Sequence, residues 1–551
     1  MINNIKQNPC IVFMLMLMGF AVEAMSQGYS YYEDPQFDPY QRLCYRVGDK
    51  QIHSSLRVYK LDDLRSICNV DSAVYADLSM PDPNVKSNIF RRFFNDDFLR
   101  WRKDGIYVAI NPLFDFELGK DSEDGRKTYI NTRGFYLNGN LDRNFWFYMD
   151  FTENQAKFPA YYMYNARVYT GVNVVPGEAM NNKMPESMSK YLISSDFDAD
   201  YRVANGYIAF NIGKYLDFQL GKGKTFVGDG YRSLFLSDVA SSYPFFKMNV
   251  TFWNVKYMFM LAQLRHHDGS TRRVKYSVTH YLDWNIGNRF TLGLFENVIQ
   301  AGWNRKTDAT RSLDWEYINP FIIFRPGEFE TGSDDNAMGG FSMKFKAANW
   351  ITFHGQFMLD DFGLDRTLHN KGHWGNKYGF LYGAKLHNMF RVNGFDMQME
   401  YSQVRPYCYS HYDGASTYAH HGESLAHPLG ANFKEGLLIV NYRHKRLMLR
   451  GQLNIAQYGA DFANDTISYG HNINTPNDYR ASDDGMYTCQ GLKTNVRFAD
   501  VSATCLINPK TAFNFTAGFR YRKQTSDELE LVSKHIYVAL RWSLKHHYYD
   551  Y

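Results

Sequence analysis

The feature that most constrains this chain is a two-residue alternation of apolar and polar side chains, which recurs from about residue 105 to residue 551. It is clearest in the segments 449–455, 513–522 and 535–544. Because successive side chains of a strand point to opposite faces, this alternation predicts strands with one apolar and one polar face.

Hydropathy argues against membrane-spanning helices but is compatible with membrane-spanning strands. The most apolar later segment, Tyr257–Leu264, has about eight residues, whereas a spanning helix needs about 20. Mean hydropathy is −0.45, yet aromatic residues make up 17% of the chain, too many for a disordered polymer. Both values fit a transmembrane barrel, because only alternate residues face lipid, aromatic rings line the interfaces and the interior is polar.

A soluble β-sandwich would also alternate, and three features favour a barrel over it. Aromatic residues gather at segment ends, as membrane interfaces require, and the segments are too many for one sandwich. We count about 18 segments, and about 450 residues at about 25 per strand with its connection give the same figure. We therefore predict an all-β fold, a transmembrane antiparallel β-barrel of about 18 strands, within about 16 to 20. The third feature is a set of mid-strand charges, which we predict to face the lumen: Glu400, Arg450, Arg520, Arg522 and Arg541.

The first 26 residues have the features of a secretory signal peptide. A positive charge at Lys6 precedes the apolar run Ile11–Val22, and the small residues Ala24 and Ser26 follow it. The run has about a dozen residues, too few to span a membrane as a helix. We therefore expect residues 1–26 to be cleaved on export. The rest should then be inserted by barrel-assembly machinery as an integral protein of the cell outer membrane, in contact with its lipid.

Residues 27–104 are predicted to form a periplasmic segment ahead of the barrel, which occupies 105–551. Alternating runs are few there, and Phe90, Phe94 and Leu99 fall at helical spacing between Asn88 and Trp101. We predict at least one amphipathic helix packed under the barrel. A surface helix without a special role is the alternative.

Charge and cysteine content exclude some partners and leave one pairing open. The formal net charge is +4, from 61 basic and 57 acidic residues, which gives no support to nucleic-acid binding. Cleavage would remove Cys10 and leave five cysteines, an odd number. Cys44 and Cys68 have the opportunity to pair in an oxidising periplasm, but spacing alone does not decide it.

Signals for catalysis are weak, and we predict a protein that is not an enzyme and has no cofactor or metal. The stretch Gly221–Thr225 lacks the glycine that a phosphate loop needs five residues earlier, where Phe218 stands. Its glycines, with those of Gly228–Gly230, are more typical of a tight turn or kink. Ser410, His411 and Asp413 are too close in one segment to form a catalytic triad.

The segment Arg405–Phe433 is the richest in functional side chains, and its length between two predicted strands is typical of a functional loop. Three interpretations stay open: rings and polar groups that bind a sugar, imidazoles that bind a metal, or a loop that packs on the barrel mouth. The imidazole spacing matches no zinc signature. The candidate glycan-binding residues are Tyr407, Tyr409, His411, Tyr412, Asp413, His420, His421 and His427.

Several ordered motifs carry a resemblance to a known family. They are Phe151–Ala156, Lys224–Leu234, Tyr317–Pro320 with Phe324–Pro326, Trp374–Gly379, and Val404–Tyr407 leading to His427–Asn432, with His53–Arg57 and Asn111–Leu113 in the same pattern. Together they resemble the RemB-type gliding-motility outer-membrane proteins of Bacteroidetes, which are related to the Wzi-like capsule assembly proteins. The resemblance covers most of the chain from about residue 50, and Cys408 is a departure from it. It implies an 18-stranded barrel with a small helical periplasmic element, and a role in surface polysaccharide or in gliding-type surface machinery, without family catalytic residues.

Two functional hypotheses follow. The first is a non-catalytic barrel that attaches or organises surface polysaccharide, from the His/Tyr-rich loop and the resemblance. The second is a porin-like diffusion channel for small solutes, in which the basic side chains predicted to face the lumen would favour anions.

Overall fold

The computed structural model describes residues 44–48, 51–60, 63, 78, 88–142, 144–164, 174–180, 199–268, 271–303, 307, 309–319, 335–361, 372–463, 466–542 and 547–551. The expected signal peptide and Cys68 lie outside these residues, so cleavage and the pairing of Cys44 with Cys68 stay predictions. No helix within the described ranges has the length and apolar character needed to cross a membrane.

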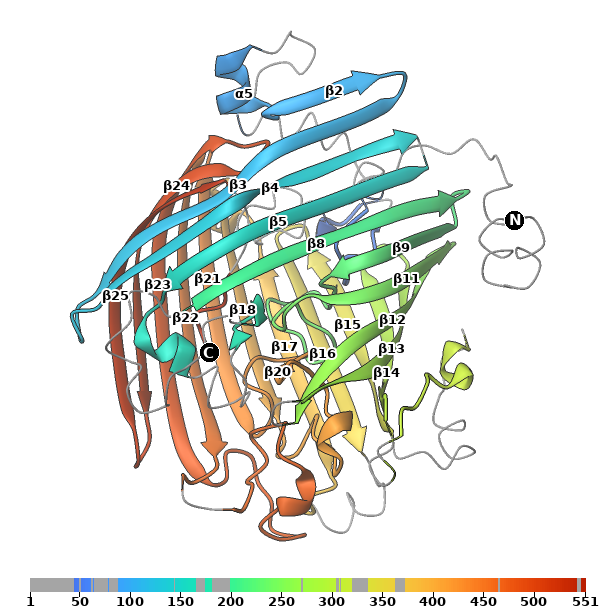
Figure 1. The fold of residues 1–551 in the computed structure, drawn as a ribbon, viewed down its shortest axis with the longest axis vertical. Helices are drawn as coiled ribbons and strands as arrows, with labels where there is room; N and C mark the ends of the chain where they lie inside the picture. The colour runs from blue at the N-terminus through green and yellow to red at the C-terminus, as the bar shows by residue number, and fades with distance from the viewer. Residues whose placement is uncertain are drawn as a thin grey trace.

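Eighteen antiparallel strands form a closed barrel (Figure 1), as the alternation predicts. The first and last strands pair with each other, for example Phe116 with Leu540, which closes the ring. The strands are β3 (Ile106–Asp121), β4 (Lys127–Asp142), β5 (Phe145–Lys157), β8 (Ala199–Ile212), β9 (Leu216–Gly223), β11 (Tyr243–Phe252), β12 (Val255–Asp268), β13 (Thr271–Ile286), β14 (Phe290–Ala301), β15 (Asn336–Ala348), β16 (Ile351–Asp361), β17 (Lys377–Leu386), β18 (Phe395–Val404), β21 (Phe433–His444), β22 (Leu447–Ala460), β23 (Leu492–Asn508), β24 (Phe513–Thr525) and β25 (Glu530–Trp542).

Short elements complete the described chain. Strand β2 pairs with the start of β3, beyond the point where β25 ends. The short elements are α5 (Ile89–Asn95), β1 (Leu56–Arg57), β2 (Leu99–Lys103), β6 (Val174–Val175), β7 (Ala179–Met180), β10 (Phe226–Val227), β19 (Ala419–His420), β20 (Glu423–Ser424), and the 3-10 turns η3 (Trp315–Ile318), η4 (Met389–Arg391), η5 (Gly414–Ser416) and η6 (Asn477–Tyr479).

The two ends of the barrel differ in their connections. At one end, the turn end, hairpins are tight, as at 253–254 and 445–446. At the other, the loop end, β18 joins β21 through 405–432 and β22 joins β23 through 461–491. Outer-membrane barrels have short periplasmic turns and long extracellular loops, which places the turn end in the periplasm. The long loops gather at the bottom of Figure 1, and α5 and β2 lie at its top.

The outer face of the strands is mostly apolar, and the inner face is polar over much of the barrel, although β12 turns Met258 and Met260 inward. In β25, Ile536 and Val538 are exposed on the outside, whereas His535 and Tyr537 are buried on the inside. The five charges predicted to face the lumen lie on the inward side of their strands. Four of them, Glu400, Arg450, Arg520 and Arg522, are buried, and Arg541 bonds Asp115 there at 3.0 Å.

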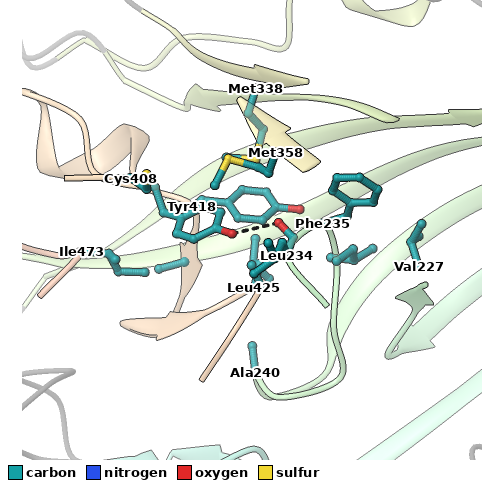
Figure 2. Close-up of a cluster of buried hydrophobic side chains, with 14 of the residues drawn as sticks. Val227, Leu234, Phe235, Ala240, Met338, Met358, Cys408, Tyr418, Leu425 and Ile473 are labelled. Atoms are coloured by element: carbon teal, nitrogen blue, oxygen red, sulfur yellow. Dashed lines mark hydrogen bonds between the residues drawn. The ribbon is translucent and has the colours of Figure 1, made fainter. Parts of the chain in front are cut away.

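The inward side chains are buried because other parts of the chain occupy the lumen. We call these parts the plug segments: residues 44–48 with 51–60, 158–164 with 174–180, 224–242, 405–432 and 547–551. Figure 2 shows their largest apolar cluster, in which Met338 and Met358 of the wall lie beside Tyr418, Leu425 and Phe235 of the plug segments.

Two features of the N-terminal part differ from the sequence-based expectation. Residues 44–48 and 51–60, expected below the barrel, lie in the lumen, where Lys344 of β15 donates to Ser54 at 2.6 Å. The helix ends at Asn95, because Asp96 is extended (φ −142°, ψ 173°) and Leu99–Lys103 pairs with β3 instead. Residues 547–551 also lie in the lumen, where Tyr549 is buried and its carbonyl accepts from the Tyr161 hydroxyl at 3.1 Å. The domain boundaries at 26 and 104 stay predictions.

Candidate functional site

The 405–432 loop folds inward, and two of its predicted sugar-binding rings are part of the core. Tyr407 and Tyr409 are buried and have positive φ values of 65° and 66°. The Tyr407 hydroxyl donates to the Ser468 carbonyl at 2.8 Å, and the Tyr409 hydroxyl donates to the Leu234 carbonyl at 2.9 Å. Burial raises the pKa of Tyr407 to about 12. Both side chains therefore anchor the loop in the lumen through their buried rings and hydroxyl hydrogen bonds.

Histidines of the two long loops are buried or partly buried, which keeps them neutral. Burial, together with His267, Arg272, Arg265 and Lys222 nearby, lowers the pKa of His421 to about 3. Burial likewise lowers the pKa of His420, and it lowers that of His471 in the next loop to about 4.

A network of charges at the centre of the lumen joins three plug segments to the wall. Arg232 donates to both carboxylate oxygens of Glu435, at 3.0 and 2.9 Å, and lies 3.0 Å from Asp550 near the C-terminus. His427 lies 2.9 Å from the same Glu435 carboxylate. Although burial lowers it, the carboxylates of Asp550 and Glu435 hold the pKa of Arg232 well above its ordinary value. Glu400, one of the predicted lumen charges, accepts from the Arg232 amide at 3.0 Å.

A second network, around Asp229, fixes the N-terminal plug segment. The Asp229 carboxylate accepts from Tyr45 at 3.1 Å and from Ser54 at 2.5 Å, and Lys344 lies 3.7 Å away. Although burial raises it, Lys344, the hydrogen bond from Ser54 and Lys385 lower the pKa of Asp229 to about 2. The neighbouring Gly228, expected at a turn or kink, has φ +148°, and a Cβ there would lie 2.7 Å from the Gln356 amide nitrogen.

At the loop end, hydrogen bonds join three loops into one outward surface, which we call the mouth surface. The loops are the one that contains Trp374, the 405–432 loop and the 461–491 loop. The Asn477 amide donates to the His411 carbonyl at 3.4 Å, and the Trp374 amide donates to the Asp483 carbonyl at 2.9 Å. Its partly or fully exposed rings and polar groups are His411, Tyr412, Asp413, Trp374, Tyr479 and Tyr487.

The predicted glycan-binding set thus divides by burial. His411, Tyr412 and Asp413 lie on the mouth surface, and His421 is partly exposed beside β12, where its Nδ1 lies 2.6 Å from Nε2 of His267. The other members are buried: Tyr407, Tyr409, His420 and His427.

Sequence reasoning missed the exposed rings of the second long loop and of residue 374. Tyr479 and Tyr487 are 56% and 64% exposed, and Trp374 carries the guanidinium of Arg480 over its ring at 4.3 Å. The signal was present, because 461–491 is as long as the loop that drew attention, and long ordered loops are typical of functional sites.

The described residues hold no group of three or more side chains suited to a metal ion. Ser410, raised earlier as a nucleophile, is buried, and its hydroxyl donates to the Tyr407 carbonyl at 2.7 Å.

No family model matches the chain, and no curated protein is similar to it in sequence. Solved structures are similar in fold. The chain is similar to the outer-membrane protein Wzi of Escherichia coli, described as a carbohydrate-binding β-barrel involved in group 1 capsule assembly. The TM-score is 0.53 and the identity 12%, over 94% of this chain and 100% of that one. The fold is that of an outer-membrane β-barrel.

Two further similarities are weaker. OprD of Pseudomonas aeruginosa gives a TM-score of 0.41 at 10% identity, over 80% of this chain and 96% of that one. OccAB2 of Acinetobacter baumannii gives 0.41 at 9% identity, over 80% and 98%. At these scores the likeness carries no argument about function.

Proposed function

We propose that this protein is a non-catalytic outer-membrane barrel that holds polysaccharide at the cell surface through the mouth surface. The observation that carries the proposal is the occupied lumen. Because the plug segments fill the lumen, the surface that the protein offers outside the membrane is the one formed by its bonded loops. The fold likeness to Wzi, a carbohydrate-binding barrel, supports this proposal.

The chemistry of the mouth surface suits a sugar. Tyrosine and tryptophan rings present an apolar face to the C–H groups of a pyranose and a polar edge to its hydroxyls. Tyr412, Tyr479 and Tyr487 supply such rings, and Asp413 and His411 add acceptors and donors beside them. Tyr407 and Tyr409 support this surface from the lumen side.

The test combines three exposed rings in one variant, Tyr412→Ala, Tyr479→Ala and Tyr487→Ala. Flow cytometry with lectins and capsule antibody should show reduced polysaccharide retention, compared with a deletion strain and its complemented parent. Tyr215→Ala is the matched control, because Tyr215 is 49% exposed but lies in a turn at the periplasmic end. Unchanged retention at normal protein level would overturn the proposal.

The resemblance to gliding-motility proteins implies a different outcome of the same experiment. A role in gliding-type surface machinery would appear as altered cell movement or adhesin display with an unchanged polysaccharide coat. Both readouts are taken on the same deletion strain.

The diffusion channel remains the competing proposal, motivated by the inward charges. Arg520 and Arg541 are paired with Asp500 and Asp115 of neighbouring wall strands at 2.9 and 3.0 Å, so these inward charges are already neutralised within the wall. We expect planar-bilayer recordings of the folded protein to be silent at neutral pH. A stable conductance would favour the channel.

A further inference from the structure

We propose that residues 89–103, which we call the rim segment, form an in-plane anchor that inserts into the inner, phospholipid leaflet of the outer membrane at the turn end of the barrel. The rim segment comprises α5, β2 and the residues between them. This inference concerns the periplasmic side and is independent of the proposed function.

The rim segment exposes an unusual amount of apolar surface. None of the side chains of α5 is buried, and Ile89 and Phe90 are 79% and 73% exposed. Phe94, Leu99 and Trp101 follow at 41%, 47% and 52%. A contiguous apolar patch of this kind in water is costly and marks an interaction site.

This patch is continuous with the lipid-facing belt of the barrel. The Phe93 ring meets the edges of Phe513 and Trp542 with centroids 5.2 and 5.9 Å apart. Those two rings are the outward-facing residues at the turn ends of β24 and β25. On the same outer face, Phe515 of β24 and Phe116 of β3 are 47% and 41% exposed.

Strand β2 continues the same outer face. Leu99 pairs with Ile110 and Trp101 pairs with Val108, both on the outward side of β3. Figure 1 shows α5 and β2 beside the ends of β3 and β24, at the end opposite the long loops. The patch therefore lies at the level where the hydrocarbon of the inner leaflet meets its headgroups.

The helix is held in this orientation by polar contacts to the barrel. Asn508 donates to the carbonyls of Arg92 and Asp96 at 3.1 and 2.8 Å, and Arg446 donates to the Phe94 carbonyl at 3.4 Å. The Asn88 side chain caps the first turn by accepting from the Arg91 amide at 2.8 Å. A helix this short has no intrinsic stability, so these contacts fix its apolar side outward.

The charges of the rim segment complement phospholipid headgroups. Arg92, Arg102 and Lys103 are exposed beside the apolar residues, an arrangement typical of helices and strands that lie in a membrane interface. A protein partner would need an apolar groove of its own to cover rings that already continue the lipid belt, so phospholipid is the favoured occupant.

The test is photo-cross-linking of the full chain, reconstituted in phosphatidylethanolamine and phosphatidylglycerol vesicles and also in native outer-membrane fragments. Benzoylphenylalanine replaces Phe90 in one variant and Ile89 in a second, so that a folding failure of one leaves the other. Leu118, 66% exposed on the outer wall, is the positive control, and Asp124, exposed in the β3–β4 turn at the loop end, is the negative control.

We expect phospholipid adducts at positions 89 and 90 within about twofold of those at Leu118, and at least about fivefold above those at Asp124. Yields at the level of Asp124 in folded protein would overturn the proposal. Adducts to a polypeptide, including a second copy of this chain, in place of phospholipid would also overturn it.

Discussion

Two ion pairs of the same chemistry show how differently the outer wall and the filled lumen are built. On the wall, Arg202 and Glu153 lie 2.9 Å apart with 65% and 47% of their side chains exposed. In the lumen, Arg232 and Glu435 lie 2.9 Å apart with 1% exposed on each side. The first pair lies near the loop ends of β5 and β8, where both side chains remain exposed. The second has lost its hydration, and each charge depends on the other.

The difference extends to the two regions as wholes. The wall is made of neighbouring strands joined by main-chain hydrogen bonds, with a repeated apolar face. The plug segments come from five parts of the chain and meet through side-chain networks around Arg232 and Asp229. Wall stability is therefore distributed along the strands, whereas plug stability is concentrated in a few buried groups.

The sharpest contrast is expected from removing one arginine of each pair. Arg232→Met leaves Glu435 and Asp550 buried together without their cation, and should cost about 3–5 kcal/mol. Arg202→Met should cost under about 1 kcal/mol. Urea unfolding in vesicles, followed by the gel shift of the folded barrel, measures both. Equal losses in the two variants would contradict the contrast.

The cost of placing a charge on the outer wall should depend on its depth in the membrane. Leu453, in the middle of β22, is 43% exposed on the outer face, and Leu447 at its turn end is 46% exposed. Leu453→Arg is expected to cost about 2–4 kcal/mol, and Leu447→Arg about 0–1 kcal/mol. The same unfolding assay applies, and a similar cost at both positions would argue that this face does not lie in lipid.

Acid should loosen the plug before the wall. The pKa of His471 falls from 6.5 to about 4 and that of His421 to about 3, chiefly through burial. Because these values are depressed, the stability they contribute is present above pH 6.5 and is lost as pH falls toward 4. Each imidazole contributes at most about 1.4 kcal/mol per pH unit. Glu423, whose pKa burial raises to about 7, acts in the opposite direction, since its contribution is lost as pH rises.

Planar-bilayer conductance measured from pH 7 to pH 4 tests this expectation. Current should appear in acid and disappear on return to neutral pH. His471→Gln should flatten the dependence, whereas His444→Gln, at the exposed turn end of β21, should leave it unchanged. A flat profile in the parent protein would show that the buried imidazoles do not control the plug.

The smallest effect on stability is expected at the mouth surface. Tyr479→Ala and Tyr487→Ala remove rings that are more than half exposed, so each should change the free energy of unfolding by less than about 0.5 kcal/mol. Reduced polysaccharide retention at unchanged stability would assign these rings to binding. A large loss of stability would assign them to the plug instead.

Much of the wall was predictable because the alternation that defines each strand is a local sequence pattern. The alternation in 535–544 predicts which side chains of β25 face lipid, and the count of such segments predicts 18 strands, as found. The rim segment was predicted only in part. The spacing of Phe90 and Phe94 indicated a helix. Leu99–Lys103 is a strand instead, because it pairs with the edge of β3.

By itself, the sequence determined the class of fold, because a period of two with inward charges is compatible with a membrane only as a closed barrel. What fills the barrel was decided by tertiary structure. Whether Tyr409 binds a sugar or supports a loop depends on Leu234, and whether Arg232 is a lumen charge or a buried bridge depends on Glu435 and Asp550. Those partners lie 175, 203 and 318 positions away, farther than any local pattern reaches.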